Sequence, residues 1–536
     1  MQKTITLKAL PSEADNELKL KEIVAQACAV TVQQITGFII QKRSIDARSR
    51  QIFIHLTLNV FINEPPQPQK PIHLQLQDVH ASDKKVIVIG AGPAGLFAAL
   101  RLIEYGIKPI ILERGKDVRA RRRDLAIMNK YGLVNAESNY CFGEGGAGTY
   151  SDGKLYTRST KRGDVRRILN IFVRYGAAEN ILYEAHPHIG TNKLPHIITA
   201  LRNEIIDCGG EVHFEKKVID FLLEKDKVHK VITADGDQLI ANAVILATGH
   251  SARDIFQLLH SKNLQLFFKP FALGVRVEHP QWLIDAAQYR LPFVFNNKGT
   301  FKRPSYLPAA SYNLVQQVSG KGVFSFCMCP GGIIAPAATD ANEIVVNGWS
   351  PSKRNNPYAN SGMVVSVQNN DLYDYIDLIE KEKSSPLIGM FFQQKIEREA
   401  YKAGGGKLVA PAQRLVDFTN NTVSQNLPDC SYLPGIHSAD LRFVVPPFIH
   451  SALKIAFKEF GKKIKGYFTN EAVVVATESR TSSPVRIPRD NDGLHHPQLK
   501  NLYPCGEGAG FAGGIVSAAM DGEKVAGLIA AKNFPL

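Results

Sequence analysis

Residues 84–114, KKVIVIGAGPAGLFAALRLIEYGIKPIILER, constrain the fold more than any other stretch of this 536-residue chain. A β-branched run ends at Gly90, and a G-x-G-x-x-G pattern then opens a segment with apolar residues at helical spacing. A second apolar run ends at Glu113, about 20 residues past the glycines. A strand, a glycine turn, a helix, a strand and an acid in this order predict a βαβ unit that binds a dinucleotide.

Each part of this unit has a physical role. The first glycine makes a tight turn, Gly92 lets the backbone approach a pyrophosphate, and Gly95 lets the helix pack closely on the strand. The helix N-terminus presents unpaired N–H groups and a partial positive charge to the phosphates. Glu113 can accept hydrogen bonds from a ribose 2′-hydroxyl, and its charge would repel a 2′-phosphate.

Three later segments indicate which dinucleotide is expected. Residues 139–154, NYCFGEGGAGTYSDGK, are rich in glycine, so their backbone can lie against a flat ring or phosphates. The run AVILATG ends at Gly249, in the manner of a strand that stops where open α/β sheets bind ligands. Residues 501–515 then bring another strand, an acid, more glycines and the start of a helix.

This layout resembles that of the flavoproteins with two dinucleotide folds, whose FAD domain is split along the chain. The resemblance implies that the fingerprint holds the ADP half, the backbone of Val218 touches the adenine, and Gly506-Glu507 hold the ribityl chain. The helix near Gly514 would aim its positive end at the flavin and stabilise the charge of the reduced ring. The expected cofactor is FAD, and the expected contacts are Gly90, Gly92, Pro93, Ala94, Gly95, Glu113, Arg114, Gly145, Gly146, Ala147, Gly148, Thr149, Val218, Ala247, Thr248, Gly249, Gly506, Glu507, Gly513, Gly514 and Ile515.

Motifs along nearly the whole chain resemble those of a family of bacterial FAD-dependent dehydrogenases that is largely uncharacterised. The motifs are RSIDAR, FGEGGAGTYSDGKL, HIGTN, ATGHSARD, GVRVEH, CMCPGG, SRTSSP and CGEGAGFAGGI. The loop 143–149 also resembles the Gly-Gly segment that lies against the flavin in the succinate dehydrogenase and fumarate reductase class. The resemblance is specific for the family and nearly silent about the substrate.

Changes of composition divide the chain into four segments of an expected α/β fold. Residues 1–80 are expected to form a small α+β domain of βαββ order, and the proline-rich linker 61–71 marks its end. Residues 81–255 and 466–536 are expected to form a split Rossmann-like FAD domain. Residues 256–465 are expected to form an inserted strand-rich substrate or cap domain. A second complete unit of strand, glycine turn, helix, strand and acid is missing, and so is a CxxC or CxxxxC pair, which argues against a disulfide reductase.

Three side chains are candidates for proton transfer, because a flavin supplies redox chemistry and the protein manages protons. Arg480 is the first, since the fumarate reductase class uses an arginine as proton donor; a structural salt bridge is the alternative. Lys154 closes the SDGK loop near the expected flavin edge, and a phosphate or surface contact is the alternative. His188 is the strongest histidine candidate for a base, although a structural histidine is the more common case.

Charge and cysteine content set the remaining expectations. The net charge of +14 and the pI of about 9.3 can reflect a solvated basic surface, and they leave a nucleic-acid partner open. Scattered cysteines indicate a reducing compartment, and Cys327-Met-Cys329 lacks the second pair of a zinc site. No run has the length of a signal peptide core or a membrane span. The chain is therefore expected in the cytoplasm, without a metal or a membrane span.

The expected function is that of an FAD-dependent oxidoreductase, which moves a hydride between flavin N5 and a small or medium organic substrate. Its electron donor or acceptor is not indicated by the sequence. Two alternatives stay open: a flavoprotein that binds or modifies RNA, and a non-catalytic FAD-bearing interaction protein. Aromatic residues interleaved with basic runs would favour RNA, and the sequence lacks such runs.

Overall fold

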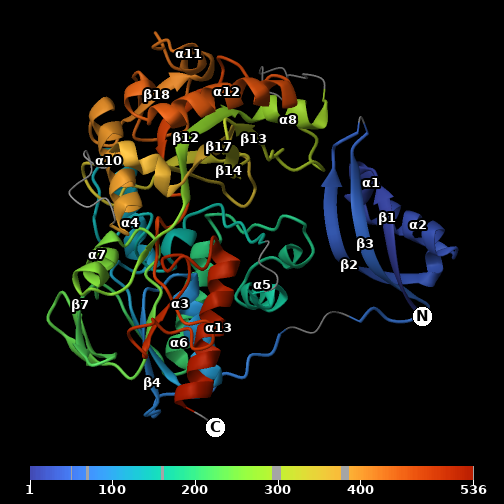
Figure 1. Cartoon of the computed structure of the whole chain (residues 1–536). Helices are drawn as coiled ribbons and strands as arrows, with labels where there is room; N and C mark the ends of the chain where they lie inside the picture. Colours follow the sequence, from blue (N-terminus) through green and yellow to red (C-terminus); the bar gives the residue numbers. More distant parts are fainter. Residues whose placement is uncertain (50, 68–71, 158–161, 292–302, 376–384, 535–536) are drawn as a thin grey trace.

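A five-stranded parallel sheet forms the centre of the lower half of the molecule in Figure 1. The apolar runs on either side of the glycine fingerprint are neighbouring strands of this sheet. From edge to edge the strands are β22 (Leu502–Pro504), β10 (Val244–Leu246), β4 (Lys85–Ile89), β5 (Lys108–Leu112) and β6 (Glu211–His213). The computed structural model describes residues 1–49, 51–67, 72–157, 162–291, 303–375 and 385–534.

Alternate residues of β4 belong to different cores. Val86 and Val88 pack among helices on one face of the sheet, whereas Ile87 and Ile89 pack against the opposite face. Both faces are buried, which explains why the run is β-branched throughout. The helices of the first face are α3 (Pro93–Glu104), α5 (Val165–Arg174), α6 (Leu194–Asp207) and α13 (Ile515–Asn533). The other face packs against α7 (Arg253–Ser261) and the small sheet of β7 (Val218–Glu224), β8 (Lys227–Thr233) and β9 (Gln238–Ile240).

The upper half of the molecule in Figure 1 is built on a seven-stranded sheet. Its strands, in spatial order, are β13 (Val315–Val318), β14 (Lys321–Cys329), β17 (Tyr358–Val367), β12 (Phe271–Pro280), β20 (Val473–Glu478), β18 (Ala410–Arg414) and β19 (Ile436–Ser438). Neighbouring strands are antiparallel, except β18 and β19. The helices that share its core are α8 (Gln281–Tyr289), α10 (Ile388–Ala403), α11 (Leu415–Asn420) and α12 (Pro447–Lys463). The α/β class with a strand-rich insertion is thus confirmed.

Strand β20 (Val473–Glu478) belongs to the cap sheet, although the expected boundary at residue 465 places it in the FAD domain. β20 follows this boundary, yet it pairs with β12 and β18 inside the cap sheet. The chain therefore returns to the parallel sheet only after Glu478. Two short ribbons lie elsewhere, one of β11 (Phe267–Phe268) with β21 (Val485–Arg486) and one of β15 (Ile333–Pro336) with β16 (Val346–Trp349).

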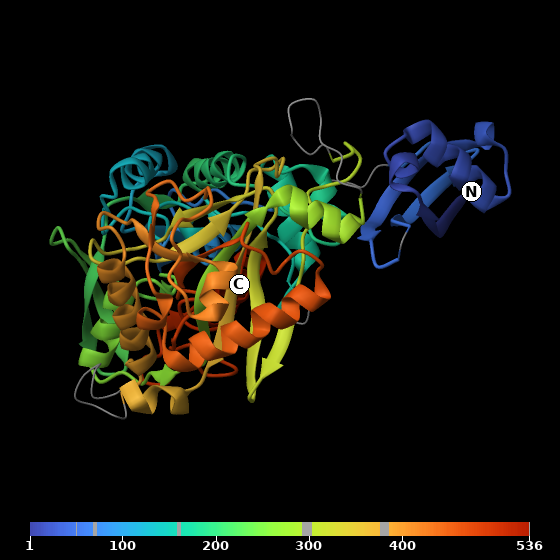
Figure 2. The same ribbon diagram turned by 90° about the horizontal axis from the view of Figure 1, so that it is seen from above.

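The N-terminal residues form a sheet of their own, drawn in blue at one side of the molecule in Figures 1 and 2. Its elements are β1 (Gln2–Ala9), α1 (Pro11–Ala14), α2 (Glu17–Cys28), β2 (Ile35–Asp46) and β3 (Phe53–Ile62). The two ends of the RSIDAR motif contact the rest of the chain. Arg43 N donates to Tyr183 O at 2.8 Å, and its guanidinium pairs with Glu184 at 2.8 Å. Arg48 O accepts from the guanidinium of Arg290 at 3.0 Å.

The boundary of this N-terminal domain can be tested by two truncations. Deleting residues 1–67 should leave a folded but less stable chain. It removes an independent core, the partly exposed Arg43–Glu184 ion pair worth about 0–1 kcal/mol, and Ile52, which is buried in the core of the cap sheet. Deleting residues 1–80 also removes Leu74 and Val79, which are buried in the core of the parallel sheet. Each such side chain contributes about 1.5–3 kcal/mol. Unfolding in denaturant and flavin absorbance measure both truncations. Loss of flavin after deletion of residues 1–67 would show that the N-terminal domain is part of the cofactor fold.

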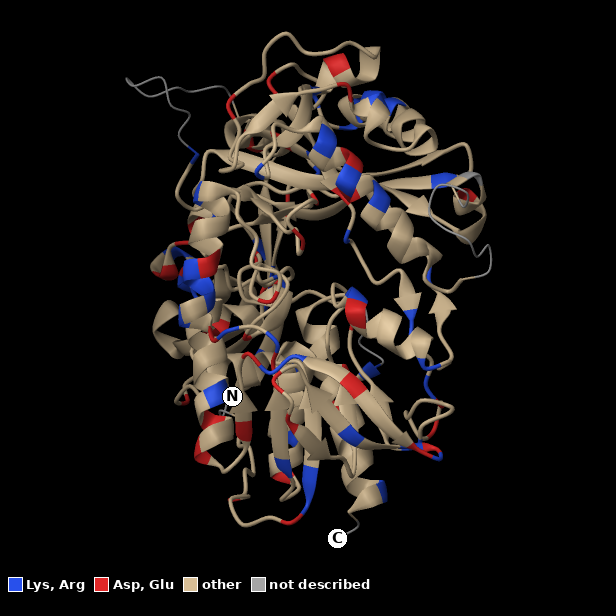
Figure 3. Ribbon diagram, turned by 90° about the vertical axis from the view of Figure 1, so that its left-hand side faces the viewer, with Lys and Arg blue, Asp and Glu red and all other residues tan. Residues whose placement is uncertain are grey.

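Charged residues of both signs are spread over the molecule. Figure 3 shows lysines and arginines interspersed with acids over both halves. Several surface lysines pair with acids, such as Lys500 with Asp226 at 2.7 Å and Lys262 with Asp220 at 2.7 Å. No helix in the part of the chain that the structure describes is long and apolar enough to cross a bilayer.

Candidate functional site

A cavity lies at the carboxyl ends of β4, β10 and β22 and extends to the cap sheet. The glycine fingerprint, the loop of the 3₁₀ turn η2 (Gly146–Gly148), the end of β10 and the start of α13 all reach it. The predicted FAD contacts that line it are Gly90, Gly92, Pro93, Ala94, Glu113, Arg114, Gly146, Ala147, Gly148, Val218, Ala247, Thr248, Gly249, Gly506, Glu507, Gly513, Gly514 and Ile515. Segments from both ends of the FAD domain therefore meet at one cavity.

Three predicted contacts lie behind the cavity wall and support it. A Cβ atom on Gly95 would lie 2.0 Å from Gly90 O, so this glycine lets α3 pack on the turn. Gly145 has a φ of +76°, and a Cβ there would meet Thr149 Oγ1 at 2.0 Å. The Thr149 hydroxyl donates to Glu144 O at 2.8 Å. These residues shape the glycine loop without lining the cavity.

The cavity has the features that a dinucleotide needs. A Cβ on Gly92 would find no atom closer than Gly146 Cα at 4.0 Å, and one on Gly513 or Gly514 would meet nothing within 4 Å. These positions therefore leave room for close approach of a ligand to the backbone. Two helices, α3 and α13, begin at the cavity, and their free N–H groups and dipoles favour anionic groups. The residues thus fit the two phosphates of FAD.

Glu113 is held at the end of β5 by the backbone around it. Its carboxylate accepts hydrogen bonds from the N–H groups of Ala91, Gly115 and Gly143, each at 2.9 Å. The side chain is 5% exposed and still lines the cavity. Each carboxylate oxygen has two lone pairs, so these bonds orient the group and leave it able to accept from a ribose hydroxyl.

The side chain of Arg114 is held on one wall. It pairs with Glu137 at 2.6 Å and Asp254 at 3.0 Å, and its guanidinium lies 4.0 Å from the centre of the Phe142 ring. Lys217 also pairs with Glu137, at 2.7 Å. This part of the cavity is therefore bounded by neutralised cations and an aromatic ring.

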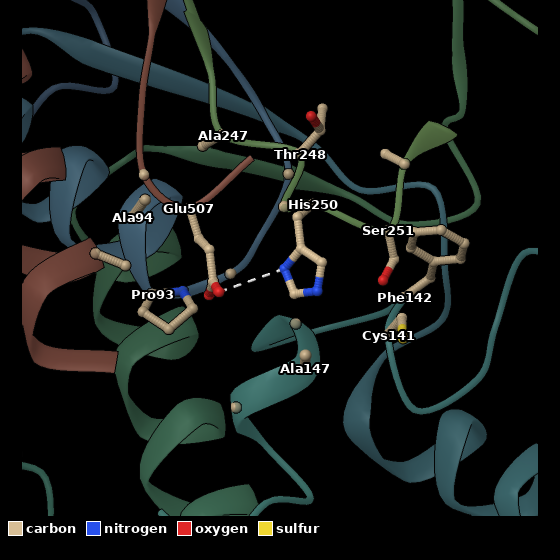
Figure 4. Close-up of a pocket in the computed structure, with 18 of the residues that line it drawn as sticks. Pro93, Ala94, Cys141, Phe142, Ala147, Ala247, Thr248, His250, Ser251 and Glu507 are labelled. Carbon is tan, nitrogen blue, oxygen red and sulfur yellow. Dashed lines mark ion pairs between the residues drawn. The ribbon is translucent and has the colours of Figure 1, made fainter. Parts of the chain in front are cut away.

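The Glu507 side chain points toward His250 in Figure 4, with Pro93 and Ala94 nearby. His250 Nδ1 lies 3.5 Å from the Glu507 carboxylate, and its Nε2 lies 3.2 Å from Arg480 O. Burial lowers the pKa of His250, although the Glu507 charge opposes this shift. Sequence reasoning missed His250 as a site residue; its place directly after Gly249 of the ATG strand was the available signal.

Arg480 lines the cavity, but its guanidinium is engaged in a buried ion-pair network. It pairs with Glu397 at 2.9 Å and Glu343 at 2.7 Å and donates to Thr339 Oγ1 at 2.7 Å. Arg253 holds the other side of Glu397 at 2.8 Å. Burial opposes the charge of Arg480, but the two carboxylates raise its pKa above the ordinary value. These contacts are those of the salt-bridge alternative, because the Nε–H and both Nη2 N–H groups of Arg480 are bound to the two carboxylates.

Lys154 and His188 lie together, but neither lines the cavity. They form an isolated antiparallel bridge between their segments. Lys154 Nζ lies 3.6 Å from Asp152 and 3.5 Å from Cys329 Sγ, which also contacts the guanidinium of Arg276 at 3.6 Å. Burial alone would raise the pKa of Asp152, but its cationic neighbours, Lys154 first, hold it below the ordinary value.

The cap contributes Phe326, Cys327 and Asn347 to the cavity, and sequence reasoning assigned none of them to the site. Cys327 has a φ of +45° where β14 shifts register against β17. This bulge turns Cys327 toward the cavity while Cys329 stays buried. Among the described residues, no group of three or more His, Cys, Asp or Glu side chains is arranged to hold a metal ion.

His188 should make stability depend on pH. Its Nε2 lies 3.2 Å from Ser352 O, and burial followed by the charge of Arg354 lowers its pKa to about 4. The unfolded chain binds this proton near pH 6.5, so the stabilisation is complete above that pH and is lost as the pH falls toward 4. The loss amounts to about 3 kcal/mol. The free energy of unfolding, measured in denaturant, should change less with pH in His188→Gln than in the wild type over this range. The control His186→Gln, at an exposed site, should follow the wild type. Equal pH dependence in all three proteins would contradict the assignment.

Three families match separate parts of the chain. The family described as "FAD-dependent protein, C-terminal domain-like" matches residues 270–481, and "FAD binding domain" matches residues 83–136. A domain of unknown function matches residues 1–61. The first two matches cover most of the cap and the fingerprint region, and they establish FAD as the cofactor.

Relatives extend these matches to the whole chain. An uncharacterised protein of Clostridium beijerinckii is 40% identical over 531 residues, which is 96% of each chain. Thiamine thiazole synthase of Aeropyrum pernix is 29% identical over 31% of this chain and 55% of its own. Glycine oxidase from Bacillus cereus covers 84% of this chain and 96% of its own, at 14% identity and a TM-score of 0.31, a level that carries no argument about function. The long match to the clostridial protein shows that the chain belongs to the same family of FAD-dependent proteins.

Proposed function

We propose that the protein is an FAD-dependent oxidoreductase that transfers a hydride between the flavin and an organic substrate held under the cap. The observation that carries this proposal is the composition of the cavity wall. The wall combines the FAD fingerprint with Phe326, Cys327 and Asn347 of the cap, so one cavity joins the cofactor segments to the inserted domain. Bound flavin would supply two-electron redox chemistry there.

The chain's own residues support this proposal by enclosing the cavity and limiting its protons. Arg480 forms part of one wall, and its charge is paired with the buried carboxylates of Glu343 and Glu397. His250, whose pKa is lowered by burial, is the histidine of the cavity wall and lies beside Glu507. We therefore assign proton transfer to His250 in preference to Arg480, Lys154 and His188.

Anaerobic mixing of the FAD-loaded protein with a panel of metabolites tests the proposal. A substrate should bleach the flavin absorbance, and an artificial electron acceptor should then restore it. Asn347→Leu, which alters the cap side of the cavity, should retain FAD but slow the bleaching. The matched control Asn342→Leu lies in an exposed turn outside the cavity and should behave as wild type. Absence of bleaching by every metabolite and every reductant would favour an FAD-bearing protein without catalysis.

A further inference from the structure

A second cavity of about 1500 Å³ lies between α4 (Val118–Tyr131) and α6. Within the described parts of the chain, it shares no lining residue with the FAD cavity. One wall is a face of α4 and the other a face of α6, because each helix contributes residues three or four apart. Trp349, Pro351 and Leu433 of the cap also line it, together with Asp117, Tyr140, Tyr150, Thr191 and Asn192. This volume exceeds the roughly 300–1,000 Å³ of an ordinary small-molecule pocket.

The charge of this cleft is positive. Arg119, Arg122 and Lys130 line it from α4, and all three are exposed. Among the residues that the structure places, no carboxylate lies within ion-pair distance of these three side chains. Arg202 lines the opposite wall and pairs with the buried Glu144 at 3.1 Å. The cleft therefore presents an excess of cations to a ligand.

The acidic residue that lines the cleft, Asp117, is bound to backbone N–H groups. Asp117 caps the N-terminus of α4, where its carboxylate accepts from Arg119 N at 2.8 Å and Ala120 N at 3.2 Å. It therefore fixes the helix start that carries the first arginine of the cleft. It offsets only part of the positive charge.

Three aromatic side chains, called here the aromatic floor, line the cleft. Tyr140 and Tyr150 meet edge to face with their centroids 6.5 Å apart, and Trp349 lies beside them in the lining. Burial raises the pKa of Tyr140 to about 12, so its phenol stays uncharged at neutral pH. The floor therefore offers neutral aromatic surface, to which ring systems bind edge to face or offset.

We propose that this cleft binds a small organic anion that carries an aromatic ring. The acid group would lie against Arg119 and Arg122, and the ring against Tyr140 and Trp349. Arginine suits a carboxylate, sulfonate or phosphate because its planar fork of donors matches two anionic oxygens. The enclosed aromatic floor distinguishes this ligand from a simple inorganic anion. This site stands independently of the proposed redox reaction.

The cleft and the FAD cavity lie on the same loop of the chain. Tyr140 and Tyr150 lie at the two ends of the loop whose residues Cys141, Phe142 and Gly146–Gly148 line the FAD cavity. One loop therefore separates the two sites. A ligand that moves the tyrosine side chains would therefore act on the loop that lines the FAD cavity.

Anilinonaphthalene sulfonate, an aromatic anion that fluoresces when bound in apolar surroundings, tests the site on the FAD-loaded protein. We expect saturable binding that the double variant Arg119→Gln/Arg122→Gln weakens about tenfold or more, which is about 1.4 kcal/mol. The matched control Arg123→Gln removes an exposed arginine of the same helix that does not line the cleft. It should bind as wild type.

Ala126→Trp provides a second variant, because it fills the cleft from an exposed helix position. It should abolish binding while flavin absorbance, measured in every variant, stays at the wild-type level. Naphthoate should displace the probe at lower concentration than the neutral naphthalene methanol or the aliphatic dodecanoate. Equal binding by the double variant, or equal competition by the neutral or aliphatic compound, would overturn the proposal.

Discussion

Gly92→Val should abolish FAD binding and leave a folded chain. A Cβ at this position meets no protein atom closer than 4.0 Å, so the added methyl groups would occupy the space that the cofactor phosphates need. The variant should be colourless after purification and after incubation with excess FAD. Its circular dichroism and unfolding midpoint should equal those of the wild-type protein stripped of FAD, because the stabilisation by bound ligand is lost from both.

Gly95→Val is the informative partner of this variant. Its Cβ would lie 2.0 Å from Gly90 O, which is backbone and cannot move aside. Overpacking of this kind costs about 1–3 kcal/mol or more, so this variant should lose stability even when FAD is absent from both proteins. If Gly92→Val is equally destabilised without cofactor, its effect comes from packing and not from the binding site.

Arg480→Ala should lower the free energy of unfolding by about 3–5 kcal/mol, because it leaves buried carboxylates with too little positive charge. Glu397 is wholly buried and would keep Arg253 as its cationic partner and the Ser479 hydroxyl as a hydrogen-bond donor, while Glu343 would lose its contact at 2.7 Å. Denaturant unfolding measures the loss. The protein that remains folded should retain FAD, because the Arg480 side chain pairs with acids away from the phosphate-binding helix starts.

Two controls separate this structural role from a catalytic one. Arg486→Ala removes an exposed arginine on the same segment and should change stability by no more than about 0.5 kcal/mol. Arg480→Ala/Glu397→Gln removes a charge of each sign and should recover part of the loss. Unchanged stability of Arg480→Ala together with lost turnover would restore Arg480 as a proton donor.

Most of the predicted FAD contacts line one cavity because their placement depends on local patterns of the chain. The fingerprint, the strand ends and the helix starts bring backbone N–H groups to the cavity. The spacing of glycines in the sequence predicts these turns, because glycine marks positions where the backbone turns tightly or approaches a ligand. Glu113 shows the same logic, since its place at the end of β5 follows from the order of elements. The relationship to the succinate dehydrogenase and fumarate reductase class stays a prediction.

The substrate half depends on contacts between distant segments, which no local pattern encodes. Arg480 meets Glu343 and Glu397 through the folding of the cap, so its neutralisation could not be inferred from ESRTSSPVR. Cys327 faces the cavity because of a bulge in β14, and a CxC spacing does not predict a bulge. The place of β20 was missed for the same reason: its partners, β12 and β18, lie far from it in the sequence.

The order of strands in the parallel sheet also bears on how the protein is made. β4 is among the first elements of that sheet to leave the ribosome, whereas its partner β10 pairs with β22, which lies close to the C-terminus. The cap must emerge between them. Contacts of such long sequence separation form slowly, and the unfinished sheet exposes an unpaired edge. Four of the five strands precede residue 247, so β10 stays the unpaired edge until β22 is made. The wall of the FAD cavity is completed only when β22 and the start of α13 join this sheet.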